Sequence, residues 1–341
     1  MIYSRNLTLL ENGGTMRALV TGASGTIASA VTRSLLRQGH AVVGTTTSGG
    51  RSPTPEGVET FAADLFEAGA PTDGQRGRRR ARGVEERRTG GRTRPNSGRR
   101  PGRGVHGNDR PLVYTGGLWL RGNVGSTPLT ADSPLAPPMV VAWHPALEEI
   151  LVEAASRRVR TVRIRPGLDY GGAGYVPLLL PPQDTDDGRV VRHFGDESNR
   201  WAVVHADDLG DLYAPAVERA PAGSVHLGAN EEPVPVRDAA KAAADKHGAQ
   251  VQHWNPADAQ RCWNVMGEAL MVDRAASSAK ARAELAWDRP GTASSTNPPR
   301  HDHIHTLPPR PASRADRGKA TRHMNHRPVP PSPHSGSRGN A

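Results

Sequence analysis

Two glycine residues near the start of the chain are spaced as in turns that bind phosphate groups. Gly22 and Gly25 follow directly after the apolar run 18–20, which is typical of a strand buried on both faces. Apolar residues then recur at helical spacing as far as Gly39, so the pattern predicts a strand, a glycine turn and a helix. In such a turn the backbone can closely approach a pyrophosphate, and the helix N-terminus offers N–H groups and partial positive charge to it.

The glycine spacing differs from the dinucleotide fingerprint G-x-G-x-x-G. Gly22, Gly25 and Ala28 give G-x-x-G-x-x-A, in which the small Ala28 still permits close packing of the helix on the strand. An ordinary turn with incidental glycines is the alternative interpretation. The strand before the turn and the helix after it favour a phosphate site.

The end of the second predicted strand, 41–46, carries hydroxyl residues instead of a carboxylate. Many dinucleotide-binding folds place an acidic residue there to bind the adenine ribose of NAD. Arg51 stands close behind and could pair with a 2′-phosphate, which favours NADP over NAD unless Arg51 is an ordinary solvated loop residue. A third strand is expected to end at Asp64 and Leu65, where a loop can contact the adenine.

The positive charge is concentrated in two segments with little apolar content. The chain has 341 residues and a formal net charge of +10, and residues 71–110 alone hold 13 arginines against 4 acidic residues. Residues 289–341 are also basic, whereas the remainder is net acidic. Both segments have the composition of disordered chain, and no aromatic residue is present in 71–110 to stack on bases. We therefore expect no nucleic-acid partner, although a basic binding arm is the alternative.

We expect the protein to be cytoplasmic. Cys262 is the only cysteine, so no intrachain disulfide can form. No run of eighteen apolar residues is present, and we expect no membrane span.

The chain lacks one element of a complete doubly wound sheet. Such a sheet needs a further apolar strand and a crossover helix after residue 65, and residues 74–109 supply neither. We interpret the basic stretch as a solvated insertion or as a stretch translated out of frame. The first strand would then lack a ladder partner, which predicts a marginally folded chain with weak nucleotide binding and poor turnover.

The expected organisation is a loose N-terminal extension (1–15), the first half of a dinucleotide-binding domain (16–65), the basic low-complexity segment (66–110), the second half with a small substrate lobe (111–288) and a disordered tail (289–341).

Five blocks taken in order resemble the extended or atypical short-chain dehydrogenase/reductases, also called NAD-dependent epimerase/dehydratases. They are TGASGTI at 21–27, VYTGG at 113–117, IRPGLDYG at 164–171, VHADDL at 204–209 and SAKARAELAW at 278–287. The resemblance implies an α/β fold, a Rossmann-like doubly wound parallel sheet with a small C-terminal lobe, interrupted by the basic segment. It also implies an NAD(P)-dependent oxidoreductase or epimerase-type activity on a small carbonyl or sugar-like substrate.

The resemblance also assigns cofactor contacts. The pyrophosphate contacts are Gly22, Ser24, Gly25, Thr26 and Ile27, and the residues beside the nicotinamide are Pro166, Gly167 and Tyr170. The blocks around His205 and Trp287 are structural in that family, so His205 is expected to pack in a core or loop.

The family's usual catalytic residues are missing. Its reaction uses a tyrosine and a lysine four residues on, and the matching positions are Trp143 and Leu147. Indole cannot act as the acid, and leucine cannot supply the charge that lowers a phenol pKa. The expected serine is Gly116. The remaining catalytic candidates are Thr115, His144 and Tyr170, although a surface position is the simpler interpretation of His144, and a ribose or packing contact that of Tyr170.

Catalysis is therefore one of several functions that stay open. The first alternative is a non-catalytic NAD(P)-binding sensor or scaffold, and the second is nucleic-acid binding through the basic segments. His301, His303 and His305 would share one face of an extended segment, as metal ligands do, but in a proline-rich tail we treat them as incidental and predict no metal site. The expected partner is a small-molecule substrate, and a homodimer is left open.

Overall fold

The computed structural model describes residues 6–12, 15–46, 54–63, 110–123, 125, 127–172, 174–195 and 198–288. All of them belong to the first of two compact units, Met1–Thr306. The second unit, Leu307–Ala341, lies outside the described residues, as do almost all of the basic segment 71–110 and the tail 289–341. The predictions of disorder for these segments therefore stay predictions.

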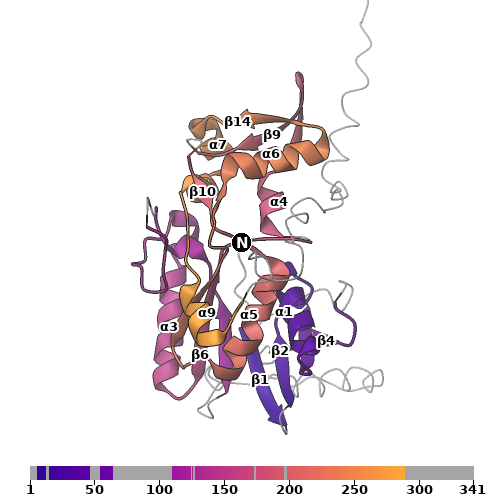
Figure 1. The fold of residues 1–341 in the computed structure, drawn as a ribbon, viewed down its shortest axis with the longest axis vertical. Coiled ribbons are helices and arrows are strands. Elements are labelled where there is room, and N and C mark those ends of the chain that lie inside the picture. Colours follow the sequence, from indigo (N-terminus) through magenta and orange to yellow (C-terminus); the bar gives the residue numbers. More distant parts are fainter. Residues whose placement is uncertain are drawn as a thin grey trace, which may run out of the picture. The chain divides into compact units, whose positions relative to one another are not determined.

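Seven strands of the described chain form one sheet in the order β12-β6-β5-β1-β2-β3-β4 (Figure 1). Their bounds are β1 Asn6–Asn12, β2 Thr15–Val20, β3 Ala41–Thr46, β4 Glu59–Ala62, β5 Pro111–Thr115, β6 Arg160–Pro166 and β12 Ser224–Gly228. The pairs β2–β3, β3–β4, β5–β6 and β6–β12 are parallel. The fold is the Rossmann-like α/β class that the sequence predicts.

The strand between β2 and β5 comes from the N-terminus and runs antiparallel to both neighbours. Leu7 pairs with Val20 of β2 on one edge and with Val113 of β5 on the other. The expected loose extension at 1–15 therefore differs from the structure, since residues 6–12 fill the position of the missing parallel strand. The physical reason is that a central strand exposes backbone N–H and C=O groups on both edges, and any extended segment can satisfy them.

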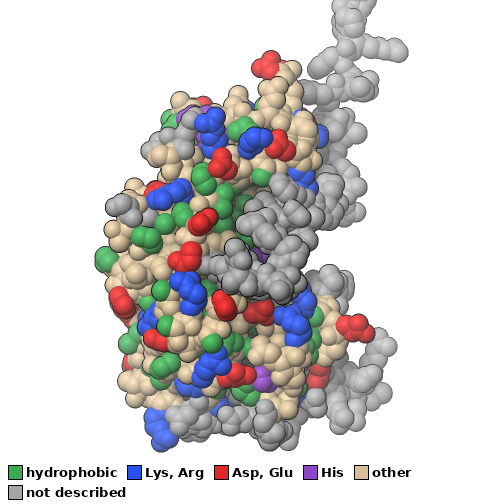
Figure 2. Space-filling view, in the orientation of Figure 1, with side chains coloured by type: hydrophobic (Ala, Val, Ile, Leu, Met, Phe, Trp, Pro, Cys, Tyr) green, Lys and Arg blue, Asp and Glu red, His purple; other side chains and the backbone are tan. Residues whose placement is uncertain are grey.

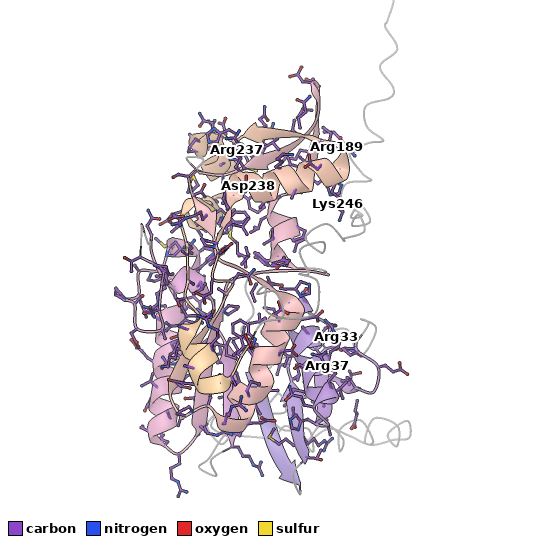
Figure 3. All side chains as sticks on the ribbon, viewed as in Figure 1. Arg33, Arg37, Arg189, Arg237, Asp238 and Lys246 are labelled. Carbon is purple, nitrogen blue, oxygen red and sulfur yellow. The ribbon has the colours of Figure 1, made fainter. Side chains whose placement is uncertain are left out.

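Helices α1 (Thr26–Arg37) and α5 (Ala206–Arg219) pack against each other on one face of the sheet. A Cβ atom at Gly210 would lie 2.6 Å from the carbonyl oxygen of Ala30, so glycine is what allows the two backbones to approach so closely. At the helix surface Arg33 pairs with Asp207 and Arg37 with Asp211, both at 2.5 Å (Figure 3).

Helix α3 (His144–Ser156) covers the opposite face. Side chains alternate between the faces of a strand, and on β6 Val162 and Ile164 join the core under α1 and α5. Arg163 and Arg165 point the other way and reach Glu148 of α3. Pro145 lacks a backbone N–H and sits in the first turn of α3, where no intrahelical donor is needed. The short 3₁₀ segment η2 (Met139–Val141) precedes it.

Segments that follow β6 build the small lobe that the sequence predicts, whereas α5 and β12 belong to the main sheet and its helix layer. Its three-stranded sheet has the order β14-β9-β8, and α6 packs on it. Bounds are β7 Leu168–Tyr170, α4 Tyr175–Leu179, β8 Pro182–Thr185, β9 Gly188–His193, β10 Arg200–Trp201, β11 Val203–His205, β13 Val234–Pro235, α6 Val236–His247, β14 Gln250–His253, α7 Pro256–Trp263, α8 Val265–Met271 and α9 Ala279–Leu285; η1, Leu118–Leu120, follows β5. After α9 the chain is fixed to α5, because the Trp287 indole N–H donates to the Asp208 carbonyl at 2.8 Å.

Deleting residues 1–15, so that the chain starts at Met16, should destabilise the domain severely. Six residue pairs between β1 and β2 and three between β1 and β5 would be lost. Unpaired buried backbone groups cost about 1–3 kcal/mol each, and the net stability of a domain is about 5–15 kcal/mol. Thermal unfolding followed by circular dichroism should show a lost or strongly lowered transition.

The variant Leu9→Pro tests the same pairing within the full chain, because proline removes a backbone donor from the middle of β1. Leu9→Val, which keeps the donor, is the matched control. An unchanged melting temperature in both the deletion and the proline variant would show that β1 does not hold the sheet together.

Candidate functional site

The turn between β2 and α1 has the geometry that a pyrophosphate needs. Gly22 has φ +62°, and its N–H donates to Thr45 Oγ1 at 3.2 Å, which fixes the turn against β3. Helix α1 starts after Gly25, with no acidic residue in its first turn and no described side chain capping it. A Cβ atom at Gly44 would lie 2.6 Å from the Ala23 Cβ, so β3 and the turn are packed as closely as glycine allows. These residues fit a bound pyrophosphate.

The predicted cofactor residues are only partly within the described chain. Ser24 is exposed, and Gly25, Thr26 and Ile27 are half-buried at the start of α1. Arg51, Asp64 and Leu65 lie outside the described residues. The preference for NADP that depends on Arg51 therefore stays a prediction.

A cleft opens beside this turn, at the carboxyl ends of β5 and β6. This is where open α/β sheets bind their ligands. The described residues that line it are Ile27, Gly116, Gly117, Leu118, Trp119, Leu120, Val141, His144, Pro166, Gly167, Leu168, Asp169, Tyr175, Trp201, Ala202 and Arg274. Ile27 in the first turn of α1 lines the cleft as well, so the cleft adjoins the N-terminus of α1. Gly167 is needed for space, because a Cβ there would lie 2.5 Å from the Ala202 carbonyl oxygen.

His144 is a titratable side chain in this lining and is 5% exposed. Its Nε2 is hydrogen-bonded to the hydroxyl of Tyr114, and Trp143 packs against the ring at 4.8 Å between centroids. Burial lowers the pKa of His144 and Arg165 lowers it further, against the opposite effect of Glu148. The imidazole is therefore neutral at neutral pH. The interpretation of His144 as a surface residue is wrong, because its side chain is buried and hydrogen-bonded to Tyr114 of β5.

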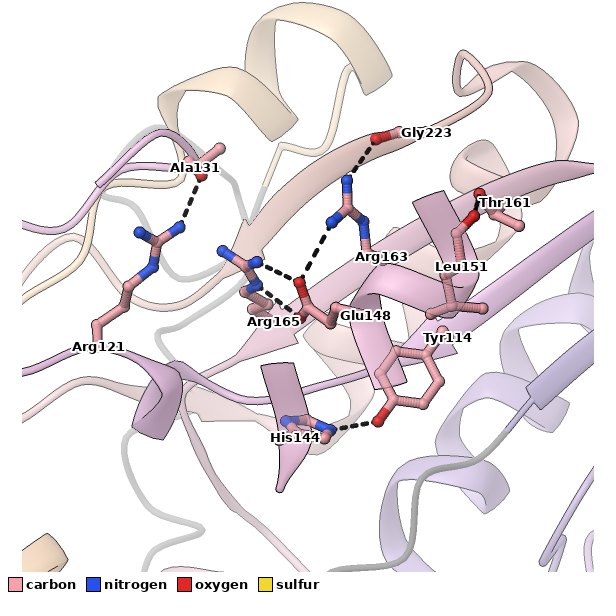
Figure 4. A network of polar contacts seen from close by, with 10 residues as sticks. All are labelled: Tyr114, Arg121, Ala131, His144, Glu148, Leu151, Thr161, Arg163, Arg165 and Gly223. Carbon is pink, nitrogen blue, oxygen red and sulfur yellow. Dashed lines mark hydrogen bonds and ion pairs between the residues drawn. The ribbon is translucent and has the colours of Figure 1, made fainter. Parts of the chain in front are cut away.

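One helical turn below His144, Glu148 anchors α3 to β6 (Figure 4). Arg165 donates to both carboxylate oxygens, with Nε 2.9 Å from Oε1, and Arg163 Nη1 lies 3.3 Å from Oε2. Burial by itself raises the pKa of Glu148, but the two guanidinium groups outweigh it and the net shift is downward. The carboxylate stays charged and fixes the helix that carries His144.

The other two catalytic candidates are engaged in packing. Thr115 Oγ1 is hydrogen-bonded to the Tyr213 hydroxyl at 2.6 Å. The ring of Tyr170 lies edge-on to His205 at 5.3 Å, and His205 Nδ1 accepts the Asp207 backbone N–H at the start of α5. Neither Thr115 nor Tyr170 is among the described residues lining the cleft.

The positions that match the family's tyrosine and lysine hold no substitute for them. Trp143 is 50% exposed, and Leu147 is half-buried. Gly116 does line the cleft, and a Cβ there would lie 3.5 Å from His144 Cε1, an ordinary contact distance.

Several residues that line the cleft belong to no motif that could have predicted their role from the sequence. Trp119, Tyr175, Trp201 and Arg274 come from four separate segments and meet only in the folded chain. Among the described residues no group of three or more His, Cys, Asp or Glu side chains could hold a metal ion. His301, His303 and His305 lie outside these residues.

Basic and acidic side chains alternate over the described part of the surface in Figure 2. On α6, for example, Lys241 pairs with Asp245 at 2.9 Å. No described helix has the length and apolar character to cross a membrane.

Several solved structures with a similar fold contain NAD. No family model matches the chain. It is 26% identical over 307 residues to the uncharacterized protein C2A9.02 of Schizosaccharomyces pombe, covering 80% of this chain and 94% of that one. UDP-glucose 4-epimerase of Thermus thermophilus, solved with NAD, has a TM-score of 0.56 at 20% identity, over 80% of this chain and 94% of the epimerase. The dTDP-glucose 4,6-dehydratase of Bacillus anthracis, also with NAD, has a TM-score of 0.56 at 13% identity, over 84% and 94%. These neighbours are extended short-chain dehydrogenase/reductases, the family that the sequence blocks resemble.

Glu148→Gln should destabilise the fold by about 3–5 kcal/mol at pH 7, because it leaves two buried guanidinium groups without their carboxylate. The folded-state pKa of Glu148 lies below its usual value of 4.5. The stabilisation is therefore complete above about pH 4.5 and is lost as the pH falls through the folded-state pKa. Denaturant unfolding at pH 7 and pH 3 should show the difference between the two proteins narrowing in acid.

Glu149→Gln is the control, since Glu149 is the exposed neighbour on the same helix. It should unfold like the unmodified chain at both pH values. Equal stability of the Glu148→Gln variant at pH 7 would mean that the ion pairs do not anchor α3.

Proposed function

We propose that the chain binds a nicotinamide dinucleotide at the turn 22–27 and catalyses hydride transfer between the cofactor and a small alcohol or carbonyl compound in the cleft. The observation that carries the proposal is the position of neutral His144 in the lining that also includes Ile27 of the turn and Pro166. A bound oxidised nicotinamide supplies the hydride acceptor. The chain has to supply a proton acceptor, and His144 is a group of that kind in the cleft.

The Tyr114 contact sets which nitrogen of His144 can act. When Nε2–H donates to the Tyr114 oxygen, Nδ1 keeps its lone pair. His144 Nδ1 then accepts the hydroxyl proton of the substrate as the C=O bond forms, and a bound nicotinamide would accept the hydride from the C–H bond. In the reducing direction the protonated imidazole returns the proton to the carbonyl oxygen. His144 thus replaces the missing tyrosine, and no lysine is required because the imidazole is already neutral at pH 7.

The choice between NAD and NADP rests on the residues after β3. Both solved neighbours named above contain NAD. The lack of a carboxylate after Thr46 and the presence of Arg51 favour NADP for this chain. The single cysteine favours the cytoplasm as the place of the reaction.

A dinucleotide-binding sensor without turnover is the second candidate. It is favoured by Trp143 and Leu147, which occupy the positions of the family's tyrosine and lysine. The two candidates share the glycine turn and differ only in whether His144 transfers a proton. They are separated by measuring binding and turnover on the same protein.

Gly22→Asp should lower the affinity for NAD(H) and NADP(H) by at least about a hundredfold in calorimetry. Aspartate adds bulk and a negative charge where the pyrophosphate would lie, at a residue with φ +62°. Gly57→Asp is the matched control, because Gly57 also has a positive φ, +82°, but nothing lies within 4 Å of a Cβ there. Equal affinities in the two variants would refute the assignment of the turn.

His144→Gln should lower the oxidation rate by about 10²–10⁴-fold while leaving dinucleotide affinity unchanged. In the unmodified protein the rate should fall in acid with a midpoint below pH 6.5, since burial lowers the pKa of His144 below 6.5 and only the neutral imidazole accepts the proton. His247→Gln, on the far end of α6, is the control. Dinucleotide binding with no turnover in the unmodified chain would select the sensor.

A further inference from the structure

Arg274 is a buried arginine among the residues that line the cleft. The residue follows α8 and is 3% exposed. Nη1 donates to the Ala269 carbonyl at 2.7 Å and Nη2 to the Arg121 carbonyl at 3.4 Å. Nε is buried and has no hydrogen-bond partner among the described residues.

The charge of Arg274 is not balanced by a carboxylate of its own. The adjacent Asp273 is held by Arg200, which donates from Nε at 2.9 Å and from Nη2 at 2.7 Å. Arg121, whose backbone carbonyl accepts from Arg274, also has a buried guanidinium, and its Nε and Nη1 lack partners in the described chain. Burial lowers the pKa of each to about 10, so both remain cationic at neutral pH. Buried cations of this kind favour an anionic ligand.

The rest of this lining is mainly aromatic and apolar. Trp119 packs edge-on against Tyr175 at 6.3 Å between ring centroids, and Trp201 and Leu118 complete the wall. Asp169 also lines the cleft, lies near Tyr175 and has interactions of its own. A ligand that fits these walls has a flat apolar body, with its negative charge at the Arg274 end.

We infer that the cleft selects substrates that carry a carboxylate, which Arg274 binds, joined to an apolar body that lies against Trp119 and Tyr175. The inference deepens the proposed function and rests on it, because it names the substrate class of the same cleft. A carboxylate fits better than a phosphate. Its two oxygens match two neighbouring N–H groups of one guanidinium, whereas a dianionic phosphate needs more donors.

Benzoate and its neutral analogue benzamide test the inference through quenching of tryptophan fluorescence. Trp119 and Trp201 line the cleft, so the readout does not require turnover. Benzoate should bind the full-length chain at least about tenfold more tightly than benzamide, as a charge-assisted hydrogen bond would give. Equal affinities of the two probes, or tighter Arg274-dependent binding of phenyl phosphate than of benzoate, would overturn the inference.

Arg274→Met should abolish the preference for benzoate while leaving benzamide affinity unchanged, which shows that the cleft is intact. Arg274→Lys keeps the charge without the planar fork and should retain only part of the preference. Arg261→Met, an exposed change on α7, is the control. A preference that survives in Arg274→Met would overturn the inference, and if that variant does not fold, an unchanged preference in Arg274→Lys would do so.

The two proposals can fail separately. Calorimetry with NAD(H) and NADP(H) is run on the same proteins. Loss of the benzoate preference with intact dinucleotide binding would reject the carboxylate site alone. Absence of dinucleotide binding with the benzoate preference intact would reject the proposed function alone.

Discussion

The structure depends on completing the hydrogen-bond ladder of β2, the strand that leads into the glycine turn. A strand in the middle of a sheet needs a partner on each edge, and β2 has β3 on one side and β1 on the other. Because β1 is antiparallel, Asn6 pairs with Tyr114 and Leu7 with Val20, so β1 enters the sheet at the carboxyl ends of its neighbours. That is the edge where the cleft and the glycine turn lie. The start of the chain is thereby coupled to the site, although it carries no motif of its own.

A second constraint is the buried charge between α3 and β6. Glu148 forms ion pairs with the guanidinium groups of Arg163 and Arg165, one helical turn after His144. The hydroxyl of Tyr114 on β5 is hydrogen-bonded to the His144 imidazole. The i, i+4 spacing of His144 and Glu148 places both on the buried side of α3, whereas Trp143 is half exposed. In this chain the inward side of α3 carries an imidazole and a carboxylate, and the positions that match the family's tyrosine and lysine carry tryptophan and leucine. The buried pair His144 and Glu148 is therefore displaced by one residue from the positions that match the family's pair.

Local sequence patterns predict those elements whose signal lies within their own residues. Strand β3 has the bounds 41–46 that the sequence predicts, and the glycine turn follows from an apolar run and the spacing of Gly22 and Gly25. The pairing of β1 could not be predicted, because backbone hydrogen bonding carries no side-chain signature and its partners lie up to about a hundred residues away. The burial of His144 was missed for a similar reason, since it depends on Tyr114, thirty residues earlier. Arg274 stands outside every block that the sequence singles out, and its place in the cleft follows from the return of the chain after α8.

The cleft lining contains two chemically different polar groups, and together they restrict how a substrate can lie. His144 is neutral, so a hydroxyl or carbonyl beside it meets a proton acceptor and not a fixed charge. Arg274 is cationic and belongs to the lobe segment after α8, where the lining includes tryptophan and tyrosine rings. Reversing a carboxylate substrate would put its charge beside a buried neutral imidazole, which cannot compensate it, and its apolar body against a buried guanidinium. If the proposed function holds, the desolvation cost of the reversed orientation favours a substrate that lies with its carboxylate at Arg274 and its reacting carbon at His144.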